Sequence, residues 1–343
     1  MEDDVKFMRR ALALAKKGMG TASPNPMVGA VVAENGKILG EGWHEAPGLP
    51  HAEIEALRSA GTAAEGADLF VTLEPCSTHG RTPPCVDAII AAGIARVVIG
   101  LLDPNPKHNG KAIETLEKAG IKTIVGVEEE KCRGINKAFF HWITTGRPYL
   151  LLKMAMTLDG KIAAPNGDSK WVTGTQARKR VMELRRWADA IMVGAGTAEK
   201  DAPSLNHRGS GAKRRQPLRI VAARSMTPEQ AAKTLAPGTQ PEIIAASNKQ
   251  EWLDALDSLG KKEITSLMVE GGGKLAAALL RVGVVNEVEF HIAPKILGGR
   301  NSIPVVEGPD PASLAEAAKL DNIRIKRMGD DIAIIGYPSS NSI

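Results

Sequence analysis

Apolar and polar residues follow two patterns along the first 145 residues of the chain. Apolar residues three or four positions apart predict amphipathic helices, and short apolar or alternating runs predict strands. The dipeptide Asn35-Gly36 is typical of a tight turn, so residues 27–44 are predicted to form a hairpin. The other predicted strands are 68–75, 95–104 and 121–127, and the predicted helices are 5–18, 52–61, 85–93, 111–120 and 128–146. Helices alternating with strands indicate a layered α/β domain.

A second α/β pattern begins after the segment Thr-Thr-Gly-Arg-Pro at residues 144–148. It predicts strands at 149–160, 189–197, 217–225, 242–247, 264–273 and 286–294, helices at 175–188 and 274–283, and a hairpin at 323–338 that turns at Gly329-Asp330. A chain of 343 residues is too long for one ordinary core. We therefore predict two domains, residues 1–146 and residues 147–343, the second with several parallel strands.

Composition narrows the classes of partner. The net charge of +5 is a mild excess that suits anionic small molecules as well as nucleic acid. Aromatic residues make up only 3% of the chain, which argues against a surface that stacks on single strands. The N-terminus lacks the apolar segment of a signal peptide, and no apolar run is as long as a membrane span. We predict a cytoplasmic protein that binds small molecules and neither nucleic acid nor membranes.

Three cysteines are too few, and an odd number, for a disulfide framework. Cys132 lies in a helical pattern and is predicted to be a packing residue. Cys76, Cys85 and His51 are candidate ligands of one metal ion. His51 precedes a predicted helix, Cys76 follows a predicted strand, and Cys85 begins a helix. A catalytic zinc takes three such ligands and keeps a fourth position for water, and a helix N-terminus favours thiolate.

Glu53 is too close in sequence to His51 to be a comfortable fourth ligand. It is well placed to carry a proton from water to a leaving group. His-x-Glu followed later by Pro-Cys is the signature of zinc deaminases. The alternative is a closed structural zinc site, for which His79 is the only nearby fourth ligand, and that scaffold would need no proton carrier.

In the second half, residues 268–280 predict a strand, three glycines and a helix. Backbone N–H groups at such a helix start can hold an anion. The glycines do not form the G-x-G-x-x-G fingerprint, so a classical dinucleotide motif is absent. A tight strand-to-helix turn explains the same glycines without a ligand.

Longer motifs make the chain similar to a known family. They are PNPMVG (24–29), HAEIEAL (51–57), EPCSTHGRTPPC (74–85) and DPNP (103–106), followed by LKMAMTLDGKIA (152–163), SKWVT (169–173), VGAGTAEKDAPSLNHR (193–208), VEGGGKLAAALL (269–280) and IAPKILGG (292–299). Eight residues separate the two cysteines, where most zinc deaminases have two. Over nearly its whole length the chain resembles the bifunctional deaminase/reductase family of riboflavin biosynthesis.

The resemblance implies an α/β fold class, with an N-terminal cytidine-deaminase-like three-layer domain and a C-terminal dihydrofolate-reductase-like domain. The first domain would use one Zn²⁺ to deaminate a diaminopyrimidinone that carries a phosphoribosylamino group, with Glu53 passing the proton to departing ammonia. Asn25, His44 and Arg81 would contact this substrate, Arg81 through its phosphate. For His79 the match is looser, because relatives often carry the histidine where this chain has Thr78.

The resemblance gives the second domain NADPH and a hydride transfer to the ribose C1′, which opens the sugar to a ribityl chain. The implied cofactor contacts are Ala155, Trp171, Thr197, Asp201, Arg224, Gly272, Gly273, Lys274, Leu275, Ala276, Ala277 and Ala278. The implied substrate contacts are Lys153, Ser169, Arg185, Leu205, Arg208 and Glu270. Arg185 and Arg208 suit the substrate phosphate, because a guanidinium can bind it in a fork, and Lys153 suits the pyrimidine carbonyls.

Two positions depart from the family pattern. Relatives usually read Asp-Asn-Pro where this chain has Asp201-Ala202-Pro203, and they usually have an Asp where this chain has Ala223 followed by Arg224. By the resemblance, the family's cofactor contact at this point falls on Arg224, whose guanidinium suits the 2′-phosphate of NADPH.

Two further interpretations stay open beside the bifunctional enzyme. One is a deaminase whose second domain does not reduce. The other is a nucleic-acid-editing deaminase, against which the low aromatic content and the cysteine spacing argue. By analogy with the family, the chain is expected to form a dimer or tetramer.

Overall fold

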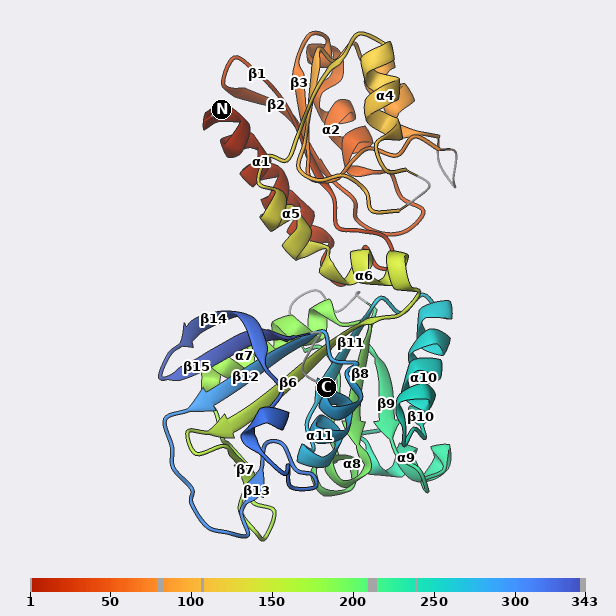
Figure 1. The fold of residues 1–343 in the computed structure, drawn as a ribbon. Coiled ribbons are helices and arrows are strands. Elements are labelled where there is room, and N and C mark those ends of the chain that lie inside the picture. Colours follow the sequence, from red (N-terminus) through yellow and green to blue (C-terminus); the bar gives the residue numbers. More distant parts are fainter. Residues whose placement is uncertain (1, 79–82, 106–107, 209–214, 238–239, 340–343) are drawn as a thin grey trace. The chain divides into compact units, whose positions relative to one another are not determined.

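The computed structural model describes residues 2–78, 83–105, 108–208, 215–237 and 240–339. The chain divides into two compact units, Met1–Gly146 and Arg147–Ile343 (Figure 1). Each unit has its own sheet and its own hydrophobic core. Within the described ranges, no helix is both long and apolar enough to cross a membrane.

The first unit is built on a five-stranded sheet in the order β2-β1-β3-β4-β5. Its strands are β1 (Gly29–Glu34), β2 (Lys37–Trp43), β3 (Asp68–Val71), β4 (Arg96–Ile99) and β5 (Lys122–Val125). Its helices are α1 (Glu2–Ala15), α2 (Ala52–Ala60), α3 (Cys85–Ala91), α4 (Lys111–Lys118), α5 (Glu129–Ile135) and α6 (Lys137–Thr145), with 3-10 turns at Lys16–Gly18 and Gly61–Ala64. Strand β1 pairs antiparallel with β2 and β3, whereas β3, β4 and β5 are parallel.

Helices cover both faces of this sheet. Ala30 and Val32 of β1 join the core beneath α2, α3 and α4, while Val31 and Ala33 join the core beneath α1, α5 and α6. This alternation follows from the two-residue period of a strand. The three-layer arrangement predicted for the first domain is confirmed, and so is the hairpin at 27–44, in which β1 pairs with β2.

Two glycines let α2 lie directly on strand β2. A Cβ on Gly42 would be 2.2 Å from the Ala52 carbonyl oxygen, and one on Gly40 would be 2.3 Å from the Ala56 carbonyl oxygen. Both distances are far below van der Waals contact, so a larger residue fits only if the helix moves. Because α2 begins directly after His51, this close packing sets the position of His51 on the sheet.

The single helix predicted over 128–146 is wrong, because α5 and α6 meet at Asn136. Asn136 has φ −110° and ψ 15°, outside the helical region. Its side chain accepts a hydrogen bond from the Met27 N–H at 2.8 Å and donates one to the Met27 carbonyl oxygen at 2.9 Å. These bonds to a distant segment compete with helix geometry and break the helix. Cys132, in α5, is buried in the core, as predicted.

The second unit contains an eight-stranded sheet in the order β10-β9-β8-β11-β6-β12-β15-β14, and β13 pairs with β7. Its strands are β6 (Tyr149–Thr157), β7 (Lys161–Ala163), β8 (Ala190–Gly194), β9 (Leu218–Ala222), β10 (Glu242–Ile244), β11 (Ser266–Glu270), β12 (Glu287–Ala293), β13 (Ile303–Pro304), β14 (Leu320–Met328) and β15 (Asp331–Pro338). Its helices are α7 (Thr175–Trp187), α8 (Ala195–Asp201), α9 (Pro228–Thr234), α10 (Lys249–Lys261) and α11 (Gly273–Val282), with a 3-10 turn at Leu314–Glu316.

The strands β10, β9, β8, β11, β6 and β12, in the order of the sheet, are parallel to one another. Strand β15 pairs antiparallel with β12, and β15 and β14 form the predicted antiparallel hairpin. Leu150, Leu152 and Met154 of β6 join the core with α10 and α11, whereas Leu151 joins the core with α7, α8 and α9. Lys153 alternates with Leu152 and Met154 and therefore faces the α7 side. This places a charged side chain beside a helix rich in arginine.

Candidate active sites

The side chains of His51, Cys76 and Cys85 meet in the first unit, and one ligand atom from each lies within 4.8 Å of the others. His51 Nδ1 is 3.2 Å from Cys85 Sγ and 3.5 Å from Cys76 Sγ. His51 precedes α2, Cys76 lies beyond the end of β3, and Cys85 is the first residue of α3. Elements that are far apart in the sequence therefore bring three donors to one place.

These distances fit a zinc ion. Bonds of about 2.3 Å to sulfur and 2.0 Å to nitrogen at a tetrahedral centre place nitrogen and sulfur about 3.5 Å apart. The Cys85 N–H donates to Cys76 Sγ at 3.2 Å, and hydrogen bonding with Cys85 and His51 lowers the pKa of Cys76, which favours thiolate. No further His, Cys, Asp or Glu of the described residues joins the cluster. Arg81 and His79 lie outside the described residues. Three protein ligands are typical of a catalytic zinc.

Glu53 lies in the first turn of α2 and is only 3% exposed. It is within hydrogen-bonding reach of Cys85, so its carboxyl group lies beside the metal ligands. Burial raises the pKa of Glu53 to about 6, against the opposing charge of His51. A carboxyl group that titrates near neutral pH can both take up and release a proton.

His44 and Asn25 lie next to the cluster. The ring of His44 contacts the ring of His51 edge to face, with centroids 5.3 Å apart. His44 Nδ1 is 3.1 Å from the Pro50 carbonyl oxygen, and its Nε2 is 3.0 Å from Asn25 Nδ2. Because a carbonyl oxygen only accepts, Nδ1 carries the hydrogen and Nε2 accepts from the Asn25 amide. Burial lowers the pKa of His44, which keeps this ring neutral and Asn25 in a fixed orientation.

The second unit contains a cavity of about 1080 Å³. Its walls include residues from strands β6, β8, β9 and β11 and from helices α7, α8 and α11. Open parallel sheets bind ligands at the carboxyl ends of their strands, where the strand order switches direction. Most of the predicted cofactor and substrate contacts line this cavity. They are Lys153, Ala155, Ser169, Trp171, Arg185, Thr197, Asp201, Arg208, Arg224, Glu270, Gly272, Gly273, Lys274, Leu275 and Ala278.

Three of the predicted contacts do not line the cavity: Leu205, Ala276 and Ala277. Ala276 and Ala277 are buried on the inner side of α11. Leu205 is 1% exposed and packs in the core with α8 and α9. The sequence motif covers consecutive residues, whereas a helix presents only one face to a ligand.

The start of α11 offers backbone N–H groups to the cavity. Gly271 and Gly272 have φ values of 98° and 84°, a region that favours glycine. They turn the chain from β11 into α11, whose first residues, Gly273, Lys274 and Leu275, line the cavity. N–H groups in the first turn of a helix have no acceptor within the helix, so they can bind an anion.

Arg185 and Glu270 form a two-point ion pair in the cavity wall, with both N–O distances at 2.6 Å. Arg185 Nη1 also donates to the Asn206 carbonyl oxygen at 3.2 Å, so the protein itself holds this guanidinium. Lys153 is 9% exposed and has no hydrogen bond or ion pair with any other described residue. The cavity therefore contains one buried ammonium group that is free to meet a ligand.

Comparison with known proteins covers both units. Residues 1–101 match the family description "Cytidine and deoxycytidylate deaminase zinc-binding region", and residues 148–334 match "RibD C-terminal domain". The riboflavin biosynthesis protein RibD of Aquifex aeolicus is 43% identical, over 97% of this chain and 98% of that protein. The RibD protein of Escherichia coli is 40% identical, over 97% of this chain and 99% of that protein. The chain belongs to the RibD family.

Solved structures agree with this assignment. The Thermotoga maritima deaminase/reductase named for diaminohydroxyphosphoribosylaminopyrimidine and 5-amino-6-(5-phosphoribosylamino)uracil has a TM-score of 0.86 and 36% identity, over 98% of this chain and 99% of that chain. Acinetobacter baumannii RibD has a TM-score of 0.87 and 33% identity, over 99% of both chains. The chain is therefore a bifunctional riboflavin-biosynthesis deaminase/reductase, with a cytidine-deaminase-like first domain and a dihydrofolate-reductase-like second domain. The predicted fold class and the predicted double activity are confirmed.

Proposed function

We propose that this chain carries out two successive steps. The domain of residues 1–146 hydrolytically deaminates 2,5-diamino-6-ribosylamino-4(3H)-pyrimidinone 5′-phosphate. The domain of residues 147–343 then reduces the ribosyl group of 5-amino-6-(5-phosphoribosylamino)uracil to ribityl with NADPH. The observation that carries this proposal is the likeness, along the full chain, to a deaminase/reductase named for both reactions.

In the deaminase, His51, Cys76 and Cys85 would hold the zinc. When bound, zinc supplies a Lewis acid that activates water at neutral pH. Glu53 takes the proton from the attacking water and delivers it to the departing ammonia, a task that suits its buried carboxyl group. Asn25, fixed by His44, contacts the substrate beside the cluster, and Arg81 binds its phosphate.

In the reductase, the cavity of about 1080 Å³ is slightly larger than the range of about 300–1,000 Å³ that is typical of small-molecule pockets, and the cofactor and the substrate would share it. The N–H groups at the start of α11, with Lys274, suit the pyrophosphate of NADPH, and Arg224 suits its 2′-phosphate. The remaining cofactor contacts are Ala155, Trp171, Thr197, Asp201 and Ala278.

The substrate lies against Lys153, Ser169, Arg208 and Glu270, all of which line the same cavity. We assign the substrate phosphate to Arg208 rather than to Arg185. The contacts of Arg185 with Glu270 and Asn206 already hold its guanidinium, so its role is to orient Glu270. When bound, NADPH would supply the hydride, and the protein would position donor and acceptor.

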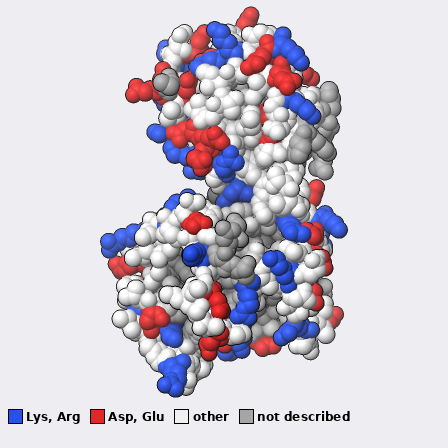
Figure 2. Space-filling view, in the orientation of Figure 1, with Lys and Arg blue, Asp and Glu red and all other residues white. Residues whose placement is uncertain are grey.

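The distribution of surface charge supports small-molecule substrates rather than nucleic acid. On the face drawn in Figure 2, basic and acidic residues are interspersed over both units rather than gathered in one basic surface. None of the three cysteines forms a disulfide, which agrees with a reducing compartment such as the cytoplasm.

Two single variants test the assignment of the two activities. Glu53→Gln is expected to abolish ammonia release while NADPH oxidation with the supplied deaminated intermediate continues. Lys153→Met is expected to abolish NADPH oxidation while ammonia release continues. If either variant lost both activities while remaining folded by circular dichroism, the separate assignment of the two sites would be contradicted.

A further inference from the structure

A row of charged residues crosses three neighbouring strands beside the reductase cavity. In the parallel register, Lys153 of β6 lies opposite Glu270 of β11 on one side and opposite Glu289 of β12 on the other. Neighbouring strands are about 4.8 Å apart, so these three side chains stand next to one another. The register therefore places an ammonium group between two acids.

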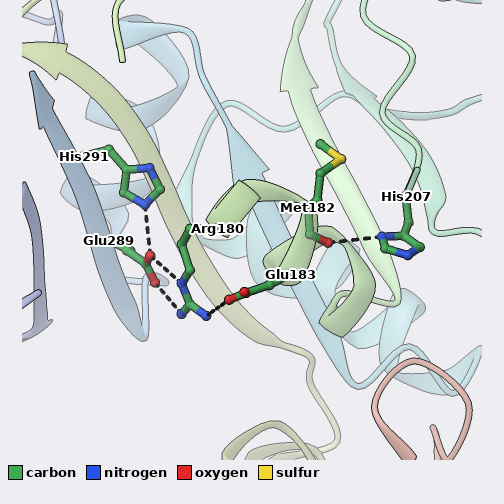
Figure 3. Close-up of polar contacts among 6 residues, drawn as sticks. All are labelled: Arg180, Met182, Glu183, His207, Glu289 and His291. Carbon is green, nitrogen blue, oxygen red and sulfur yellow. Dashed lines mark hydrogen bonds and ion pairs between the residues drawn. The ribbon is translucent and has the colours of Figure 1, made fainter. Parts of the chain in front are cut away.

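Each of the two acids has an arginine partner from α7. Arg185 holds Glu270, and Arg180 holds Glu289 through two hydrogen bonds of 3.0 Å (Figure 3). Such two-point contacts are the strong form of an ion pair and fix both groups in orientation. Lys153 lines the cavity, whereas Glu289 and Arg180 do not. Glu289 is thus a buried carboxylate directly behind a residue that meets the ligand.

His291 completes the surroundings of Glu289. Its Nε2 is 2.9 Å from Glu289 Oε1, and both residues are almost fully buried. Burial alone would raise the pKa of Glu289, but hydrogen bonds from His291 and Arg180 lower it to about 2. Glu289 is therefore a carboxylate that accepts from His291 Nε2. Burial lowers the pKa of His291, so this ring is neutral and leaves the negative charge of Glu289 in place.

We propose that Glu289, held by Arg180 and His291, is a positioning residue of the reductase that keeps the Lys153 ammonium charged and aimed at the bound substrate. This inference rests on the proposed reductase function. Glu289 does not reach the cavity, so it acts through Lys153.

The charges around Lys153 show why Glu289 matters. Burial lowers the pKa of Lys153, and Arg185 adds to this lowering, while the carboxylates of Glu270 and Glu289 oppose it. The other ionisable groups of this cluster are Arg180 on α7 and His291 on β12. Glu270 opposes the lowering more strongly than Glu289 does, but it also lines the cavity. Glu289 lies outside the cavity and therefore acts on Lys153 from behind, without contacting the ligand.

The test is the pH profile of kcat/KM for NADPH oxidation with the supplied deaminated intermediate, first for the wild-type chain and then for Glu289→Gln. Removing the negative charge lowers the pKa of Lys153 further, so activity is lost at a lower pH on the alkaline side. We expect this alkaline limit to fall by about one pH unit, within the range that one nearby charge produces. Activity is expected to recover toward the wild-type value at lower pH, because the substitution keeps the shape of the side chain.

Glu183→Gln is the matched control. Glu183 contacts the same guanidinium, at 3.2 Å from Arg180 Nη1, but its side chain is 51% exposed and it does not pair with β6 (Figure 3). The alkaline limit of kcat/KM in the Glu183→Gln variant is expected to equal that of the wild-type chain. Circular dichroism of each variant reports on its fold, and recovery of NADPH oxidation at lower pH shows that the second domain itself is intact.

Glu289→Gln leaves Arg180 without its buried partner, which destabilises proteins. The double variant Arg180→Met, Glu289→Met leaves no unpaired charge and is expected to show a smaller downward shift, because the loss of the Arg180 charge offsets part of the loss of the Glu289 charge. If the wild-type chain reduces while both variants keep its alkaline limit, the positioning role is wrong and the reductase function stands. If the wild-type chain oxidises no NADPH at any pH, the reductase function is wrong, and the positioning role fails with it.

Discussion

The close packing of α2 on strand β2 leads to a sharp prediction for Gly42→Ala. The added Cβ would lie 2.2 Å from the Ala52 carbonyl oxygen and 2.5 Å from the Ala56 nitrogen, whereas ordinary contact begins at 3.4 Å. Because both atoms belong to the helix backbone, α2 must withdraw by about 1 Å. Such overpacking typically costs about 1–3 kcal/mol of stability.

The same displacement moves His51 and Glu53, which lie at the start of α2. A misplacement of about 1 Å at a catalytic site can cost about 100-fold in rate. We therefore expect Gly42→Ala to lose zinc and to release ammonia at least about 100-fold more slowly. Zinc is measured by metal analysis of the purified chain, and NADPH oxidation with the supplied intermediate measures the second domain, which should keep its activity.

Gly134→Ala is the control for Gly42→Ala. Gly134 lies in α5 of the same unit, and a Cβ there would meet nothing within 4 Å. Alanine in a helix interior is expected to stabilise by about 0.5–1 kcal/mol, with zinc and ammonia release unchanged. A Gly42→Ala protein with full zinc content and wild-type ammonia release would refute the argument that this packing positions the site.

Three further predictions concern stability and metal content. Ala202→Gly is expected to raise the free energy of unfolding by about 1 kcal/mol in urea titrations, because Ala202 has φ 41°, where a Cβ is unfavourable; an unchanged or lower midpoint would argue against strain. Glu74→Gln is expected to cost about 1.5–3 kcal/mol, because the buried carboxylate accepts the N–H groups of Asp103, Gly110 and Ala112, and an amide cannot serve all three; a loss below about 0.5 kcal/mol would contradict this. Removing zinc with a chelator is expected to stop ammonia release and spare NADPH oxidation, and added Zn²⁺ should restore the first activity; a simultaneous loss of both would contradict two separate sites.

The zinc ligands could be predicted from the sequence because their signals are local. His51 and Cys85 each lie at a helix start, and Cys76 follows a short apolar strand. The position of each ligand relative to its own helix or strand could therefore be predicted from the neighbouring residues. The break at Asn136 could not be predicted in this way. It depends on hydrogen bonds to Met27, which lies 109 residues away in the sequence.

Helix α10 shows a different kind of miss. No element is predicted for residues 249–261, although the sequence carries a helix signal there. Asn248 caps the helix by accepting from the Glu251 N–H at 3.0 Å, and Trp252, Leu256 and Leu259 are buried at helical spacing. A capping residue followed by apolar residues at helical spacing is a local signal that predicts this helix.

In the second domain, the motifs contain most of the residues that line the cavity, but they do not show which of these side chains are neighbours. Lys153 could be identified as a charged residue in an apolar strand. Its two acidic neighbours, Glu270 and Glu289, are 117 and 136 positions further along the chain, and only the register of three strands brings them together. Strand order is a long-range property, so no local pattern predicts this row of charges.

One assay can show whether a single chain catalyses both steps. The purified, zinc-loaded protein is incubated with the phosphoribosylamino diaminopyrimidinone, with and without NADPH, while ammonia and NADPH are followed together. We expect ammonia release without NADPH. When NADPH is present, we expect its oxidation after a lag, as the deaminated product accumulates. Ammonia release with no loss of NADPH would contradict the second activity, and no ammonia from zinc-loaded protein would contradict the first.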